Sequence, residues 1–264
     1  NTSANNAGYF VGDANWGEIG GAKTQKADAA VFVISRYGTE ATDVPMTGDK
    51  SDMTNGNYLA LSPNERDVLK NLKAQKAAGT FGKIIVLMNS AVQLQCDFLE
   101  DAELEVDAML WVGEPGSTGT YAIGDLLSGK VNPSGKLTHT VWKQHLYNPV
   151  YANWSKDPNK DETKGEYKYA NSTGAPARSA KYVVYQEGIY NGYRYVETRY
   201  EDKVLGAENV GDFDYSAAVS YPFGYGLSYT QFEYSDFKVT PSKGKYTVSL
   251  TVKNVGDTAG KDVV

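Results

Sequence analysis

The chain has 264 residues, of which 41% are hydrophobic and 22% charged, values typical of a folded globular protein with a sizeable core. Its net charge of −6 and its lack of a Lys/Arg block argue against nucleic acid or an anionic membrane surface as partners. It holds no apolar run of about 18 residues, the length that spans a membrane. The lone Cys96 allows no internal disulfide, and no signal-peptide pattern opens the sequence, so the compartment is undetermined.

The first clear pattern lies at residues 29–43, AAVFVISRYGTEATD. The continuous apolar run 29–34 predicts a strand buried on both faces, and a polar loop follows it. In open α/β sheets, the loops at the carboxyl ends of parallel strands carry the ligand groups. Glu40, in this loop, is therefore the candidate catalytic residue.

Further elements follow in the alternating order of a parallel α/β sheet. Ser62, Pro63 and Glu65 form a capping box with proline at the first helical position, and Gly79 suits the end of that helix. The remaining pattern predicts strands at 84–88, 108–112 and 137–141, a helix at 121–128 and a weaker helical stretch at 94–103.

The carboxyl-terminal part changes character. Residues 143–181 are polar and proline-containing and predict an excursion over the surface. In residues 182–200 aromatic residues recur at alternate positions, a pattern that favours a strand or an aromatic-lined edge. Residues 237–260 predict two antiparallel strands, clearest at 246–253, followed by a turn. Two strands are too few to close a sandwich, so we expect the sequence to be cut at this end.

Two motifs that could indicate a phosphate-binding or a metal site lack residues that such a site requires. Gly124-x-x-x-x-Gly129-Lys130 is followed by Val131, where a phosphate loop has the Ser or Thr that holds magnesium. His139 and His145 have no carboxylate or Cys at ligand spacing, so we expect no metal site. The acidic residues of the 36–52 loop are the remaining candidates for a chemical role. Their spacing is compatible with three interpretations: an acid/base role, a solvated acidic loop or a calcium-binding loop.

Five stretches together resemble one known family, glycoside hydrolase family 3, which holds β-glucosidases and β-xylosidases. They cover most of the chain and occur in the family's order. They are ADAAVFVISRYGTEATD (27–43), LSPNERDVLKNL (61–72), GEPGSTGTYAIGDLLSGKVNPSGKLTHTV (113–141), YQEGIYNGYRY (185–195) and YPFGYGLSYTQFEYS (221–235).

The resemblance implies a fold and a division into domains. It implies an α/β fold, an (α/β)6 sandwich with a mostly parallel, flavodoxin-like sheet between helices. Such a domain is expected over 1–232, lacking its opening strands and carrying the surface excursion at 143–181. Residues 233–264 resemble the first strands of an all-β, fibronectin type III-like domain. The partner implied for the sandwich is a (β/α)8 barrel, which this sequence does not contain.

The resemblance also implies an activity: retaining hydrolysis of terminal β-linked sugars from the non-reducing end of an oligosaccharide or glycoside. In this family the nucleophile is an Asp on the barrel and the acid/base a Glu on the sandwich. By its place in Arg-x-x-x-Glu-x-x-Asp, that Glu maps onto Glu40, with Arg36 and Asp43 as substrate-binding or loop-supporting neighbours. No metal or organic cofactor is implied. The chain alone is expected to be inactive.

The chemistry restricts what Arg36 does. A retaining glycosidase needs two carboxyl groups about 5–5.5 Å apart, one attacking and one protonating the leaving oxygen. The protonating group must hold its proton when substrate arrives, which requires a raised pKa. A close cation would lower that pKa. We therefore hypothesise that Arg36 holds the loop backbone or Asp43, and does not pair tightly with Glu40.

Some points remain open at this stage. The family often has Ser-Gly-Glu-Gly around the acid/base, where this chain has Gly38-Thr39-Glu40-Ala41. A non-catalytic carbohydrate-binding or adhesion module of the same fold is the alternative function. A flavodoxin-like nucleotide binder is disfavoured, because no strand leads through a glycine-rich turn into a helix. Glucose, xylose and N-acetylglucosamine specificity are not distinguished. Tyrosines between 185 and 195 fit domain packing better than sugar stacking.

Overall fold

The structure, a computed structural model, describes residues 4–5, 8–9, 15–36, 58–150, 166–169, 178–181, 185–208 and 210–264. The chain divides into two compact units, which we describe separately. Unit 1 comprises residues 1–114 and 141–221, and unit 2 comprises residues 115–140 and 222–264. No helix among the described residues is long and apolar enough to cross a membrane.

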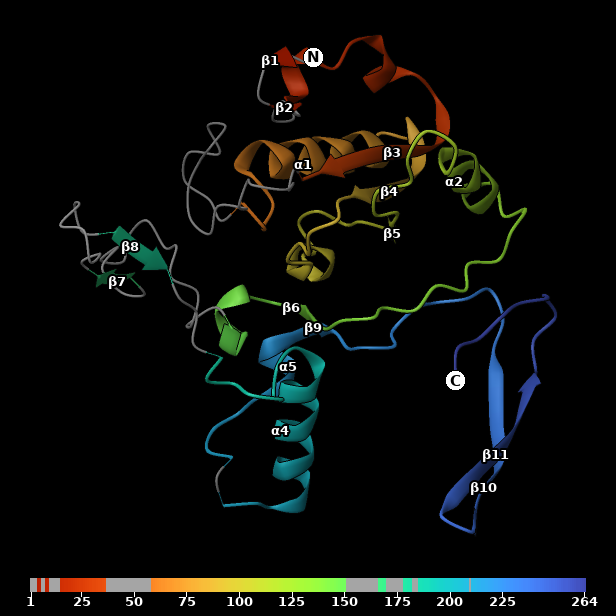
Figure 1. The fold of residues 1–264 in the computed structure, drawn as a ribbon. Coiled ribbons are helices and arrows are strands. Elements are labelled where there is room, and N and C mark those ends of the chain that lie inside the picture. Colours follow the sequence, from red (N-terminus) through yellow and green to blue (C-terminus); the bar gives the residue numbers. More distant parts are fainter. Residues whose placement is uncertain are drawn as a thin grey trace. The chain divides into compact units, whose positions relative to one another are not determined.

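Unit 1 is built on a three-stranded parallel sheet (Figure 1). Its strands are β3 (Ala27–Ser35), β4 (Phe81–Asn89) and β5 (Ala108–Trp111), in the order β3-β4-β5. The strands are in register across the sheet, with Val33 opposite Leu87 and Leu87 opposite Leu110. All three carboxyl ends therefore meet at one edge, which confirms the predicted α/β class.

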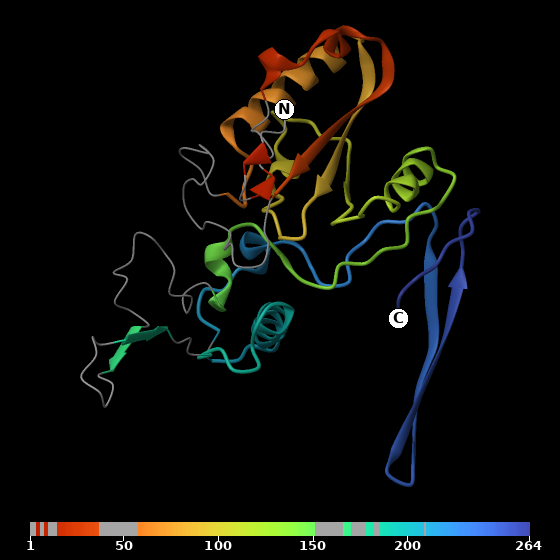
Figure 2. The same ribbon diagram turned by 45° about the horizontal axis from the view of Figure 1, so that its top comes forward.

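Helix α1 (Pro63–Ala77) connects β3 to β4 and packs on β4, beside the strands in Figures 1 and 2. Ser62 Oγ accepts from the Glu65 backbone N–H and the Glu65 side chain accepts from that of Ser62, so the predicted capping box is confirmed. The helix buries Val68, Leu69 and Leu72, which are 3.6-periodic apolar positions. Beyond its end, Gly79 has φ +75°, a value that glycine adopts without strain.

The prediction that β3 is buried on both faces is wrong. Ile34 is 1% exposed, but Val31 and Val33 are 46% and 52% exposed. Side chains alternate across a strand, so these two valines lie on the face opposite Ile34. The described part of the chain covers that second face of β3 only partly.

Two other predicted elements are shorter than expected. The helical stretch at 94–103 contains a single 3-10 turn, η3 (Asp97–Glu100). The strand at 137–141 is reduced to β6 (Val141–Trp142), which pairs antiparallel with β9 (Val219–Tyr221). Leu137 instead exchanges backbone hydrogen bonds with the 224–225 turn of unit 2, where its N–H donates to Tyr225 O.

The strand or edge predicted for 182–200 is wrong over its second half. Residues Tyr193–Leu205 form helix α4, which ends at Gly206 in the left-handed conformation. Val196 is fully buried in a cluster with Trp142, Ala218 and Val219, and Tyr195 packs against that cluster. Tyrosines at alternate positions give the two-residue period of a strand, but the structure has a helix here that buries Val196 in this cluster.

The other short elements of unit 1 lie around these. Two strand pairs are antiparallel, β1 (Ala4–Asn5) with β2 (Gly8–Tyr9) and β7 (Glu166–Tyr169) with β8 (Arg178–Lys181). The pair β7–β8 falls within the predicted surface excursion. The remaining turns and helices are η1 (Trp16–Glu18), η2 (Gly21–Thr24), η4 (His145–Tyr147) and α5 (Tyr215–Ala218).

Unit 2 contains helix α2 (Thr120–Leu127) and a long antiparallel hairpin, β10 (Phe232–Ser242) with β11 (Lys245–Asn254). Both the helix and the two strands were predicted, and both predictions are confirmed. The Asn132 side chain joins three parts of the unit. Its Nδ2 donates to Ala259 O, and its Oδ1 accepts from Ser228 Oγ and from the Tyr229 N–H. The Asn-Pro-Ser-Gly-Lys-Leu motif is thus accounted for by structural contacts.

Candidate active site at the carboxyl end of the sheet

Polar side chains join the three strands where they end. Ser35 Oγ lies 3.4 Å from Asn89 Oδ1, and the Arg36 N–H donates to Asn89 O at 3.4 Å. Asn89 Nδ2 donates to Gly113 O, just beyond β5, at 2.6 Å. The ends of β3, β4 and β5 are therefore cross-linked at the edge where open α/β sheets place their sites.

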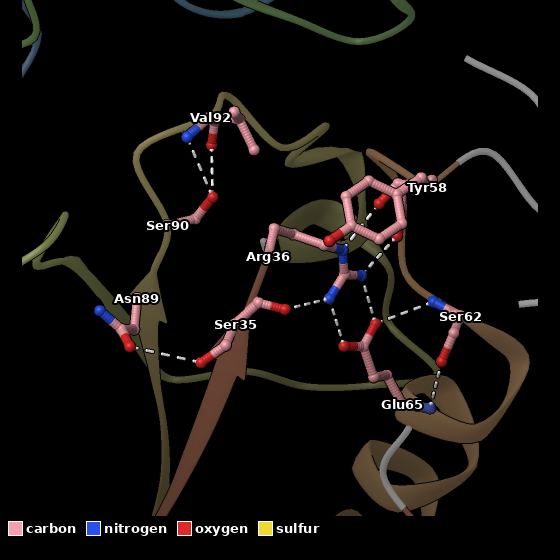
Figure 3. A network of polar contacts seen from close by, with 9 residues as sticks. Ser35, Arg36, Tyr58, Ser62, Glu65, Asn89, Ser90 and Val92 are labelled. Carbon is pink, nitrogen blue, oxygen red and sulfur yellow. Dashed lines mark hydrogen bonds and ion pairs between the residues drawn. The ribbon is translucent and has the colours of Figure 1, made fainter. Parts of the chain in front are cut away.

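The Arg36 guanidinium is the centre of this edge (Figure 3). Its Nε donates to Tyr58 O at 2.7 Å, its Nη1 to Ser35 O at 2.9 Å and its Nη2 to Ala60 O at 2.8 Å. Nη1 and Nη2 each also donate to one carboxylate oxygen of Glu65, both at 2.6 Å. These contacts use all five N–H donors that a guanidinium has.

The ion pair between Arg36 and Glu65 is buried, with side-chain exposures of 1% and 7%. It has the parallel two-bond geometry that makes Arg–carboxylate pairs strong and directional. Glu65 Oε2 also accepts from the Ser62 N–H at 2.8 Å, so the carboxylate has three donors. A buried charge pair needs this degree of satisfaction to offset its desolvation.

The segment that follows residue 57 is held by the same edge. Tyr58 O and Ala60 O accept from Arg36, and Leu59 O between them accepts from the Gln95 N–H at 2.6 Å. The guanidinium carbon of Arg36 lies 5.6 Å from the centroid of the Tyr58 ring, within the range of a cation–π contact. Three consecutive carbonyls are thus fixed to β3 and to the chain after β4.

Of the predicted site residues, the structure describes Arg36 alone. Glu40 and Asp43 lie outside the described residues, so their roles remain predictions. Sequence reasoning identified Glu65 only as a helix cap. An available signal was the presence of Arg36 directly after an apolar strand, because a buried Arg requires a buried carboxylate.

Burial shifts the pKa of two further groups in unit 1. Desolvation lowers the pKa of His145 to about 4, against the opposing effect of a hydrogen bond that the imidazole donates to the Gln93 backbone. It raises the pKa of the Cys96 thiol to about 12, with a smaller contribution from Asp97. His145 is therefore neutral near pH 7 and Cys96 is not a thiolate. Within the described ranges no group of three His, Cys, Asp or Glu side chains could hold a metal ion.

The fold and this edge together define a class: an α/β domain with a parallel sheet and a cross-linked polar carboxyl edge. The model of the glycosyl hydrolase family 3 C-terminal domain matches residues 17–193, well over half of the chain. The chain belongs to this family.

Individual relatives agree with this assignment. The chain is 29% identical over 245 residues to a β-glucosidase of Ruminococcus albus, covering 91% of this chain and 20% of that protein. It is 31% identical over 268 residues to β-glucosidase A of Butyrivibrio fibrisolvens, covering 90% of this chain and 27% of that protein. The chain thus spans about a fifth to a quarter of the length of these relatives.

A solved structure also matches. β-Glucosidase 3B of Thermotoga neapolitana, determined in complex with glycerol, superposes with a TM-score of 0.61 at 31% identity. The match covers 88% of this chain and 26% of that one.

Proposed function

We propose that this chain supplies the general acid/base of a retaining β-glycosidase, and that Glu40 is this residue. The substrate class is a terminal, non-reducing β-D-glycosyl residue, and β-glucosides are favoured because the relatives named above are β-glucosidases. The nucleophilic Asp would come from a (β/α)8 barrel outside these residues. Protonation of the leaving oxygen by one carboxyl and attack by the other is the chemistry of a retaining enzyme.

The observation that carries the proposal is the position of the Arg-x-x-x-Glu-x-x-Asp segment. It begins at Arg36, directly after β3, at the carboxyl edge of a parallel sheet in a family 3 domain. Such an edge is where an α/β sheet places reacting groups. Glu40 follows the strand by five residues and Asp43 by eight, so both carboxyls belong to the stretch of sequence between β3 and α1.

The contacts of Arg36 support an acid role for Glu40. All five of its N–H donors have partners among Ser35, Tyr58, Ala60 and Glu65. A guanidinium in this arrangement supports the loop backbone, and its charge is already paired with Glu65. A tight pair with Glu40 would favour the ionised carboxylate and work against its role as a proton donor.

The strands β10 and β11 support a further proposal, that residues 233–264 belong to an all-β, immunoglobulin-like fold. Val239 pairs with Val248 and Pro241 with Tyr246, and these apolar residues share one face of the hairpin. The opposite face holds Thr240, Thr247 and further polar residues. A hairpin with one apolar face is suited to packing against a second sheet.

Replacement of Glu40 in the full-length gene product tests the acid/base assignment. We expect Glu40→Ala to lower kcat/KM on cellobiose by about 100-fold or more, the usual contribution of general acid–base catalysis. Added azide should restore turnover of 2,4-dinitrophenyl β-glucoside and give a β-glucosyl azide, because azide attacks the glycosyl-enzyme without a general base. Unchanged activity, or no azide product, would exclude Glu40.

A second measurement tests the division of roles. The 264-residue chain, purified alone, should not hydrolyse aryl β-glucosides, because one carboxyl cannot complete the retaining mechanism. Turnover by the isolated chain that disappears in Glu40→Gln would contradict the proposal. A full-length protein that binds glycosides without hydrolysing them would favour a binding module.

A further inference from the structure

The Arg36–Glu65 pair joins two points of the chain that are close in space and separated in sequence by the segment carrying Glu40. Arg36 directly precedes residues 37–57, and Tyr58 directly follows them. Through Nε and Nη2, the Arg36 guanidinium binds the carbonyls of Tyr58 and Ala60. The two ends of the segment are therefore tied together by a single side chain, as Figure 3 shows.

Glu65 determines where this guanidinium lies. Its two carboxylate oxygens accept from Nη1 and Nη2 at 2.6 Å, which fixes both the position and the plane of the guanidinium. Glu65 is itself held, because Oε2 accepts from the Ser62 N–H and its own N–H donates to Ser62 Oγ at 3.0 Å. The carboxylate thus connects the end of β3 to the first turn of α1.

This arrangement exceeds what a helix cap requires. A capping box needs one acceptor oxygen from the residue at the third helical position. Here the same carboxylate also binds a buried guanidinium in two-bond geometry. That guanidinium in turn satisfies three backbone carbonyls, those of Ser35, Tyr58 and Ala60.

We propose that Glu65 is a positioning residue for the acid/base of this domain. It fixes Arg36, and Arg36 fixes both ends of the segment in which Glu40 lies. Fixed ends reduce the conformational freedom of a loop, and a general acid must be held within a fraction of an ångström of its working position. The proposal rests on the proposed function of Glu40. It gives Glu65 no contact with substrate.

The test compares two substrates that differ in whether their leaving group must be protonated by the general acid. The leaving group of cellobiose is glucose, whose basic oxygen must be protonated as the glycosidic bond breaks, whereas 2,4-dinitrophenolate leaves without a proton. A poorly placed acid therefore slows the first substrate and spares the second. General loss of folded protein lowers both rates equally.

The variant is Glu65→Gln in the full-length gene product. Gln keeps an acceptor for the Ser62 N–H, so the helix cap is retained, but the charge and the paired acceptor oxygens are lost. We expect kcat/KM to fall about tenfold or more on cellobiose, part of the usual range for general acid catalysis, and no more than about threefold on 2,4-dinitrophenyl β-glucoside. The matched control is Glu103→Gln. Glu103 pairs with Lys70 at the surface, and we expect no change on either substrate.

A charge-balanced variant guards against misfolding. In Arg36→Met/Glu65→Gln neither buried charge is left unpaired, a change that buried ion pairs often tolerate. It removes the hydrogen bonds to Tyr58 and Ala60, so the same selective loss on cellobiose is expected. Equal losses on both substrates in the two variants would overturn the positioning role.

Glu40→Gln separates this proposal from the one on which it rests. If Glu40→Gln shows the selective loss on cellobiose and the Glu65 variants do not, the positioning role fails and the acid/base assignment stands. If Glu40→Gln shows no selective loss, the acid/base assignment itself fails, and the role of Glu65 fails with it.

Discussion

Burial and partners decide the behaviour of single residues in this chain. Arg36 and Glu65 lie in the interior as a fully hydrogen-bonded pair, whereas Lys70 and Glu103 form an ion pair at the surface. The first kind of pair fixes geometry and is costly to break, and the second contributes little to stability. His145 is a third case: its imidazole is kept neutral by desolvation.

The pKa of His145 predicts a pH dependence of stability. Because the folded-state pKa is about 4 and the unfolded value is near 6.5, the unfolded chain binds a proton first as the pH falls. His145 therefore makes the free energy of unfolding decrease between pH 6.5 and pH 4, by at most about 1.4 kcal/mol per pH unit. Below pH 4 the folded chain also protonates, and the decrease from this group ends.

Urea unfolding at pH 7, 6, 5 and 4 measures this effect. We expect His145→Asn, which keeps a side-chain N–H and cannot be protonated, to show a shallower decrease than the original chain over that window. Parallel curves for the two proteins would mean that His145 does not contribute.

At the scale of elements, polar contacts fix how helix and strands meet. Asp107, just before β5, accepts from the Ile84 N–H of β4 at 2.8 Å and from Lys76 of α1 at 2.9 Å. Lys83 donates to its other oxygen at 3.0 Å. One carboxylate thus connects α1, β4 and the start of β5, while the apolar residues of α1 supply the packing.

We expect Asp107→Asn to lower the free energy of unfolding by about 1–2 kcal/mol at pH 7, because hydrogen bonds to charged partners are weakened. Partial burial opposes ionisation, but the hydrogen bonds from Lys76, Ile84 and Lys83 outweigh it and lower the pKa of Asp107 to about 2. The stability that the carboxylate contributes is complete above pH 4 and is lost as the pH falls through 2. The difference between the two proteins should therefore shrink in that range.

Chemical unfolding of the two proteins from pH 7 to pH 2 checks this prediction. The matched control is Asp125→Asn, because Asp125 pairs with Lys130 at the surface of unit 2. It should change stability by no more than about 0.5 kcal/mol. A difference for Asp107→Asn that stays constant down to pH 2 would refute the role of its charge.

At the scale of the whole molecule, each of the two units is assembled from two segments that are separated in the sequence. Unit 2 combines residues 115–140 with residues 222–264, so its two segments must be held by contacts between them. Asn132 and Lys136 provide several. Lys136 Nζ donates to Gly226 O at 2.7 Å and pairs with Asp262 at 3.2 Å.

Replacing Asn132 should loosen unit 2 selectively. Asn132→Ala removes the hydrogen bonds to Ser228, Tyr229 and Ala259, and a loss of about 1 kcal/mol raises an opening equilibrium about fivefold. We expect trypsin to cleave the β10–β11 hairpin several-fold faster, while cleavage of unit 1 is unchanged. Asn191→Ala, which removes only a surface contact with Arg194, is the control. Equal cleavage rates in all three proteins would contradict this role.

The sequence alone determined the local elements whose signals are local. The capping box at Ser62, the apolar runs of β3, β4 and β5 and the alternating β11 each depend on neighbours within a few residues. The motif order also indicated the family, which the family-model match confirmed. Sequence reasoning further placed Arg36 at the end of a strand, where a site residue is expected.

Only the tertiary structure decided what depends on distant partners. Helix α4 resembles a strand in its tyrosine spacing, and its burial of Val196 against Trp142 and Val219 is a contact with distant residues that the local pattern does not reveal. Burial of β3 likewise depends on what covers each face, which the run of apolar residues cannot encode. Glu65 is a cap by its local pattern. Its pairing with Arg36, 29 residues away, exists only because the fold brings the end of β3 to the start of α1.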